Sequence, residues 1–408
     1  MEDAVLPPFA ASIYWMLPGP RDFVDSVSHA IANSRALVVA AQGRAVTGLR
    51  FAFEHALRAS HSDIDQPIRL RIEDGTHIDS DVGHHMGLAT MSASQLARHG
   101  CGMRHTIVLA PGTPSAVEKC RQYLLGFVEA LRSAPSRGTV TLVVLRVDLG
   151  TPWPSLDGLK QVKFSGALSP EEMRAYIGMR MIDRRGPGST ALTQHLVAEF
   201  AGFDAGFAEE LMRLNEHDLL GLPHSLALVA HRMPTLDAIW RESRFDTGSI
   251  AEVNGDVQAH VLHEWHLASH DGPMREAARR SIASRYWRAA LHALMPWLEE
   301  RRHRIVTILK PALEVHLAPT GGVKHKPSFR GDRVIEIAIP DLECNDIVQM
   351  KLDRERPLMV YSPHQKEAVD VCFRVTKVRN ELAHMKCPDF EAITALIQAM
   401  DELLRDPQ

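Results

Sequence analysis

The chain contains 408 residues, 45% of them hydrophobic, so it is long enough for two or three domains that each bury a core. Its formal net charge of -4 argues against a protein coated with nucleic-acid-binding charge. The N-terminus lacks a basic region followed by an apolar run, and no stretch approaches the roughly 20 apolar residues that span a bilayer, which predicts a cytoplasmic protein without a membrane partner.

The first part of the chain alternates apolar runs with amphipathic stretches. The apolar runs predict strands at residues 36–40, 68–72, 106–110 and 140–147, and the amphipathic stretches predict helices at 21–33, 46–58 and 115–132. This alternation is typical of an α/β domain with a mostly parallel sheet. The third and fourth runs are almost wholly apolar, as expected of strands covered on both faces. We therefore predict an α/β domain over residues 1–150.

Helical patterns replace this alternation in residues 151–250, which we predict to be all-helical. A capping box with proline at the first helical position, Ser169-Pro170-Glu171-Glu172, predicts a helix that begins near Pro170. Further helices are predicted at 191–200 and 205–214, and the small polar residues 247–255 predict a linker.

Residues 251–408 form a third predicted region, again mainly helical. Residues 274–316 predict one or two long helices with Pro296 and Pro311 as interruptions, and 319–333 predict an exposed basic loop. A short apolar segment at 334–339 and a short helix at 342–352 follow. The capping box Ser362-Pro363-His364-Gln365 starts a helix that extends to His384, and Asp389 is expected to cap a last helix with a broad apolar face.

Positive charge is concentrated in one of these helical stretches. Residues 275–310 carry nine Arg or Lys side chains against three Glu. Such a stretch would attract phosphates, but a run of charge is also typical of an ordinary solvated helix face.

The most informative motif lies near the end of the last helix but one. It reads Arg379-Asn380-Glu381-Leu382-Ala383-His384, with an arginine and a histidine separated by four residues. At about 100° per residue, Arg379 lies at the edge of the apolar stripe, and Asn380 and His384 share the other side of the helix. A polar group at the rim of an apolar stripe becomes enclosed when a second copy packs against it.

This motif resembles the R-x(4 to 6)-H motif of HEPN-domain ribonucleases. The upstream segment Ile339-Pro340-Asp341-Leu342-Glu343 is similar to an element of related HEPN domains, and the resemblance covers roughly the last 90 to 130 residues. It implies a helical bundle that dimerises through its C-terminal helices, so that two copies of the motif line one RNA-cleaving cleft. Arg379, Asn380 and His384 would then be the catalytic residues, and no cofactor or metal is implied.

The residue types suit RNA cleavage without a metal. A histidine side chain, with an unperturbed pKa near about 6.5, can exchange protons with a ribose 2′-OH or a leaving 5′-oxygen. An arginine stabilises the charge that develops on the phosphate, and the asparagine could orient the imidazole. The alternative is a structural arginine together with a histidine favoured by the negative end of the helix dipole.

The N-terminal domain resembles a degenerate P-loop ATPase of the AAA and STAND type. The loop after the first strand, Ala41-Gln42-Gly43-Arg44-Ala45-Val46-Thr47-Gly48, lacks the G-x(4)-G-K-[ST] pattern that cradles phosphates. ATP hydrolysis is therefore not expected. Gly43, Arg44, Thr47 and Asp148 are candidates for binding a nucleotide, and the alternative is that the sheet is retained only as a scaffold.

Metal and thiol chemistry find little support. The string beginning at His263 has Leu267 where a zinc protease needs its second histidine, and Asp79, Asp81, His84 and His85 have no recognisable ligand geometry. The five cysteines form no C-x-x-C pair, which predicts buried thiols in a reducing compartment.

Three functions remain open on the sequence alone. The leading hypothesis is a metal-independent HEPN endoribonuclease of the toxin or anti-phage defence type, a hydrolase that binds RNA, forms a homodimer and works with partner proteins. The second is an inactive ATPase- and HEPN-derived interaction or regulatory subunit of a defence complex. The third is a nucleotide-responsive regulator whose ligand binds near Gly43.

Overall fold

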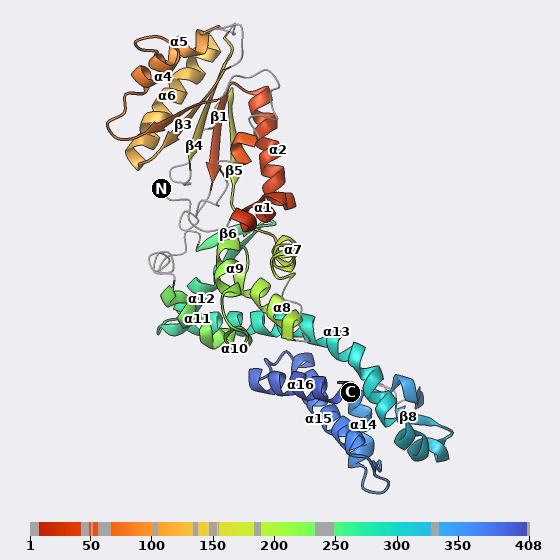
Figure 1. The fold of residues 1–408 in the computed structure, drawn as a ribbon. Coiled ribbons are helices and arrows are strands. Elements are labelled where there is room, and N and C mark those ends of the chain that lie inside the picture. Colours follow the sequence, from red (N-terminus) through yellow and green to blue (C-terminus); the bar gives the residue numbers. More distant parts are fainter. Residues whose placement is uncertain are drawn as a thin grey trace. The chain divides into compact units, whose positions relative to one another are not determined.

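A computed structural model gives the architecture of the chain (Figure 1). It describes residues 8–41, 49, 52–55, 67–100, 105–133, 138–146, 153, 155–182, 189–232, 249–327 and 334–405. The chain divides into two compact units, one made of residues 1–180, 201–210 and 233–266, the other of residues 181–200, 211–232 and 267–408.

The first unit contains a parallel five-stranded sheet with strand order β2-β3-β4-β1-β5. Its strands are β1 (Ala36–Ala41), β2 (Ile68–Ile72), β3 (His105–Pro111), β4 (Val140–Arg146) and β5 (Leu159–Phe164). Its helices are α1 (Pro8–Met16), α2 (Pro18–Asn33), α4 (Ile78–His85), α5 (Ala93–Arg98), α6 (Pro114–Ser133) and α7 (Pro170–Arg180). The α/β fold and its four predicted strands are confirmed.

Helices cover both faces of this sheet, with α2 on one side and α4, α5 and α6 on the other (Figure 1). Alternate residues of each strand therefore enter different cores. Val38, Ile107 and Val144 belong to the core that α6 covers, whereas Leu37 and Val143 are buried but lie outside that core. This two-sided burial explains why the sequences of β3 and β4 are almost continuously apolar.

The remainder of the chain is rich in helix. Its elements are α8 (Ser189–Ala201), α9 (Ala205–Met212), α10 (Glu216–Leu220), α11 (Leu222–Arg232), β6 (Ile250–Val253), β7 (Asp256–Ala259), α12 (Val261–Ser269), α13 (Arg275–Leu317), β8 (Val323–Pro327), β9 (Val334–Ala338), α14 (Cys344–Leu352), α15 (Pro363–Ala383) and α16 (Phe390–Leu403). Short 3-10 turns lie at Ala318–Thr320 and Ile339–Asp341. In the second unit α15 packs against α13, α14 and α16.

Three predictions were wrong, each because short strands gave a weak local signal. Residues 151–250 are not all-helical, since β5 joins the sheet beside β1. Residues 250–253 of the predicted linker are β6, which pairs with β7. The predicted basic loop includes β8, whose polar residues pair with β9 in an antiparallel hairpin, and a strand made mostly of polar residues lacks the apolar alternation that would reveal it.

Other local predictions were confirmed only in part. Residues 275–317 form one helix that continues through Pro296 and Pro311. Of the predicted helix at 46–58, only residue 49 and residues 52–55 are described, and they are helical. Three cysteines are buried as expected (Cys120, Cys344 and Cys372), Cys387 is exposed contrary to expectation, and Cys101 lies outside the described residues.

Candidate active site

The helix that carries the motif, α15, begins where its sequence predicts. The hydroxyl of Ser362 accepts a hydrogen bond from the amide of Gln365 at 3.1 Å, and Pro363 occupies the first turn. The predicted apolar stripe of Val371, Val375, Val378 and Leu382 is buried. Capping and burial therefore fix both the start of α15 and the face that it turns to the core.

The end of α15 determines the position of His384. His384 is the C-cap residue, and Met385 follows it with a left-handed φ of 55°. The amide of Lys386 donates to the carbonyl of Glu381 at 2.8 Å and that of Met385 to Leu382 at 3.1 Å, which is the Schellman pattern of helix termination. His384 is thus an exposed residue held on a defined backbone turn.

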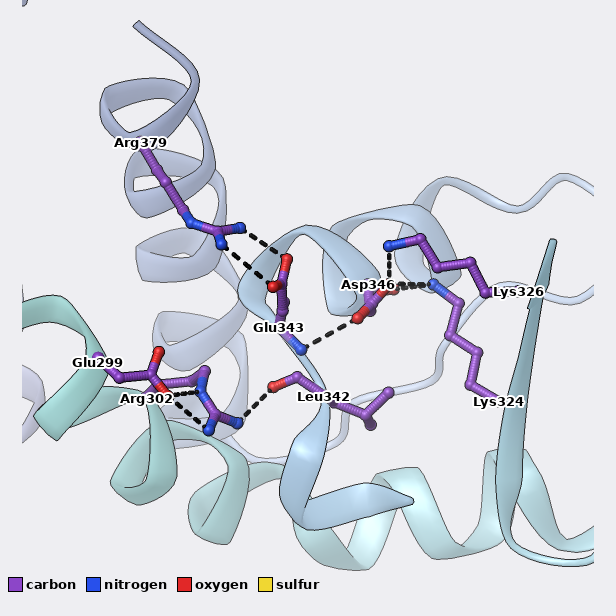
Figure 2. A network of polar contacts seen from close by, with 8 residues as sticks. All are labelled: Glu299, Arg302, Lys324, Lys326, Leu342, Glu343, Asp346 and Arg379. Carbon is purple, nitrogen blue, oxygen red and sulfur yellow. Dashed lines mark hydrogen bonds and ion pairs between the residues drawn. The ribbon is translucent and has the colours of Figure 1, made fainter. Parts of the chain in front are cut away.

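Arg379 is held by a carboxylate from the neighbouring helix. Its two terminal nitrogens donate to the two carboxylate oxygens of Glu343 at 2.6 and 3.1 Å (Figure 2). Both side chains are about two-fifths exposed, at 40% and 42%. The hydrogen bond with Glu343 is the main reason that the pKa of Arg379 is raised above its usual value. The guanidinium is therefore cationic, fixed in direction and still open to solvent.

Glu343 is itself held from two sides. Arg302 of α13 donates to the carbonyl oxygens of Pro340 at 2.8 Å and Leu342 at 3.0 Å, which fixes the backbone just before Glu343. Arg302 also pairs with Glu299 at 2.7 Å. On the other side, the amide of Glu343 donates to Oδ2 of Asp346 at 3.1 Å (Figure 2).

Asp346 is a buried charge that joins the hairpin to this network. Its side chain is only 1% exposed, and its Oδ1 lies 2.9 Å from Nζ of Lys324 and 3.6 Å from Nζ of Lys326. Burial raises the pKa of Asp346, but the hydrogen bonds from Lys324 and from the Glu343 amide, with the two lysine charges, outweigh burial and lower it. The network therefore extends from β8 through α14 to Arg379.

A cavity of about 190 Å³ lies beside this network, between α13, the start of α14 and α15. Arg379 and Asn380 both line it, together with Glu343, Thr376 and other side chains of these three helices. His384 is not among the lining residues. On a regular helix it starts about 140° around the axis from Arg379 and about 7.5 Å along it. The structure thus brings two of the three predicted catalytic residues together and leaves the third exposed at the helix end.

The sequence did not identify Glu299, Arg302 or Asp346 as neighbours of the motif, because they lie on other elements. Glu343 was partly signalled, since it ends the segment Ile339 to Glu343 that resembles an upstream HEPN element. Its pairing with Arg379 was not predicted.

Several arginines of the basic stretch in α13 form contacts within the protein. Arg288 lies 2.8 Å from a carboxylate oxygen of Glu199, and Arg285 donates to the backbone carbonyl of the same residue. Arg302 binds the backbone near Glu343, as described above. These arginines stabilise the helical unit, so their role is structural. Arg279 and Arg280, by contrast, are exposed.

The candidate nucleotide-binding residues Gly43, Arg44, Thr47 and Asp148 all lie outside the described residues. In the part of the chain that is described, no group of three or more His, Cys, Asp or Glu side chains is arranged to hold a metal ion. Over the same residues, no helix combines the length and the apolar character needed to cross a membrane.

Comparison with protein-family models and with curated proteins finds no match for this chain. The chemistry assigned to the site therefore depends on its own residues.

Proposed function

We propose that the protein is a metal-independent endoribonuclease of the HEPN type, with Arg379 and His384 as its principal catalytic groups. The observation that carries this proposal is the fixed guanidinium of Arg379, held by Glu343 at a cavity mouth, on the same capped helix that ends at the exposed His384. Both groups are open to a polymeric substrate. A fixed cation and an exposed imidazole are the two groups that cleavage through a 2′-OH requires.

In this mechanism each group has a distinct task. His384 takes the proton of the ribose 2′-OH, whose oxygen attacks the neighbouring phosphorus while the bond to the 5′-oxygen breaks, and a histidine returns a proton to that 5′-oxygen. Arg379 stabilises the charge on the phosphate oxygens. Asn380 lies one turn before His384 and can orient either the imidazole or the phosphate. The need for a 2′-OH restricts the reaction to RNA.

A second copy of the chain completes this proposal. Arg379 and His384 start from different sides of α15, so a homodimer formed through the C-terminal helices can place the arginine of one copy near the histidine of the other. In such a toxin or defence protein, partner proteins would control when the cleft is accessible. We propose a scaffold role for the P-loop-like α/β unit, supported by its parallel sheet with helices on both faces.

The test is cleavage of bulk RNA and transfer RNA by the purified chain with EDTA present. Arg379→Ala and His384→Ala should each abolish cleavage while the circular dichroism spectrum is retained. Arg374→Ala and His364→Ala are matched controls, because both side chains are exposed on the same helix away from the cavity lining. Equal loss in the controls, or unchanged cleavage in the first pair, refutes the assignment.

A specific observation favours one alternative, an inactive subunit that has kept the bundle for assembly. The charge of Arg379 is already matched by Glu343, as in an ordinary structural ion pair. A wild-type protein that dimerises but cleaves no RNA, alone or with the proteins encoded beside it, would support this alternative.

A further inference from the structure

The cavity beside Arg379 has the size of a single ring system. Its volume of about 190 Å³ is below the roughly 300–1,000 Å³ of sites that enclose a drug-sized ligand. The buried side chains of Leu298 and Val375, with the half-buried Met295, supply apolar walls. A flat aromatic ring is the kind of group that such a narrow apolar space accepts, as in pockets that hold an unstacked base.

Polar groups also line this space. Asn345 and Asn380 each offer an amide donor and acceptor. The hydroxyl of Thr376 is buried and makes no hydrogen bond within the part of the chain that is described. A buried hydroxyl without a partner is unfavourable, so a ligand group that reaches it and bonds to it would be bound more tightly.

The charges of the lining residues indicate which part of a ligand enters the cavity and which part stays outside it. Glu299 and Glu343 are each paired with an arginine, so these four lining side chains carry no net charge and suit an uncharged group better than a phosphate. Carboxylates accept hydrogen bonds from the exocyclic amino groups of bases. Uracil has no such amino group and offers a carboxylate only its ring N3–H, which two carbonyl oxygens flank, so it is expected to bind less tightly. Arg379, open to solvent at the mouth, is the group suited to the phosphate.

We propose that this cavity binds one amino-bearing nucleobase, adenine, cytosine or guanine in preference to uracil, of a nucleotide whose phosphate contacts Arg379. This inference deepens the proposed function and rests on it for the choice of a nucleotide as ligand. Applied to RNA, it makes the cavity the subsite that selects the nucleotide next to the cleaved bond.

The test uses the full chain with its methionine methyl groups labelled with carbon-13, because Met295 lies in the cavity wall and reports occupancy directly by NMR. The probes are AMP, CMP, GMP and UMP, with ribose 5-phosphate as a ligand that lacks a base. The three amino-bearing nucleotides should shift the Met295 signal and bind about three- to tenfold more tightly than UMP, the worth of about one hydrogen bond. The exposed Met359 should not respond.

Two variants separate recognition from folding. Thr376→Val removes only the unpaired hydroxyl, so it should leave the melting temperature unchanged or higher while weakening AMP binding about three- to tenfold. Thr394→Val is the matched control, since that threonine lies on α16 outside this cavity lining. Met295→Trp fills the space and should abolish binding, and Glu299→Gln should reduce the preference for AMP over UMP.

The outcomes distinguish this inference from the proposed function. RNA cleavage that ignores base identity and survives Met295→Trp would refute the base subsite and leave the nuclease intact. AMP binding by a protein that cleaves no RNA would refute the nuclease and support the subsite. Equal shifts with ribose 5-phosphate or UMP, or a Met295 signal that responds only to dimer formation, would refute the base subsite.

Discussion

The buried carboxylate of Asp346 makes a testable link between stability and the proposed site. Asp346→Asn keeps the shape of the side chain and an acceptor for the Glu343 amide, but removes the charge that faces Lys324 and Lys326. Loss of one partner of a buried ion pair costs about 3–5 kcal/mol. Lys324 is 13% exposed and keeps two acceptors, the carbonyl of residue 346 at 3.3 Å and Gln349 at 3.1 Å, which lowers the expected cost. We therefore expect about 2–3 kcal/mol.

Urea unfolding and thermal unfolding, both followed by circular dichroism, measure this loss. In a unit of about 200 residues, each kcal/mol corresponds to about 2–4 °C, so the melting temperature should fall by about 4–12 °C. Glu336→Gln is the matched control, because its carboxylate is 69% exposed and pairs with His325 at 3.6 Å in the same hairpin. That exposed pair should contribute at most about 1 kcal/mol.

The same substitution tests whether the network positions Arg379. If Asp346 orients Glu343, Asp346→Asn should also reduce RNA cleavage measured well below the melting temperature, whereas Glu336→Gln should not. A loss in stability smaller than about 0.5 kcal/mol would show that the buried pair barely stabilises the unit, and the reasoning from its burial would be wrong.

Three further outcomes follow from the same contacts. The pKa of Asp346 is lowered in the fold, so its contribution to stability is complete above the unfolded pKa of about 3.9 and is lost as the pH falls through the folded pKa. The urea midpoints of wild type and Asp346→Asn should therefore converge below about pH 4, and a difference that stays constant would contradict this. Met385→Gly should raise stability by about 0.5–1 kcal/mol in thermal unfolding, since glycine adopts a left-handed φ freely and Met385 is 78% exposed; a decrease would mean that the side chain stabilises the turn. Trp287→Phe removes the 2.8 Å hydrogen bond from Nε1 to the carbonyl of Leu382, which should lower the free energy of unfolding by about 1 kcal/mol. Amide hydrogen exchange at residues 382–386 should become faster, and unchanged exchange would contradict the prediction.

Sequence patterns were sufficient where structure depends on neighbours along the chain. The capping boxes at Ser169 and Ser362, the apolar stripe of α15 and the apolar runs of β3 and β4 each combine a local signal with burial, and the elements formed there. The position of Arg379 at the edge of a buried stripe was likewise readable from the helical period.

The remainder required the tertiary structure. Glu343 and Arg379 are 36 residues apart, and Arg302 and Leu342 are 40 apart, so no local pattern joins them. Strand β8 escaped prediction because its Lys324 and Lys326 are polar for a reason that only packing reveals, the buried Asp346 of α14. The cavity depends on three helices at once, and its lining residues follow no single helical period.

The two prolines within α13 give this long helix an uneven stiffness. A proline has no amide hydrogen, so the carbonyl one turn earlier loses its intrahelical partner and the helix bends most easily there. Pro296 follows Met295 directly, so one of these two points lies beside the wall of the cavity, while Pro311 lies four turns further on. A bend at Pro296 would change the distance between α13 and α15 at the cavity. The width of the cavity beside Arg379 could then change while α13 stays helical before and after the proline.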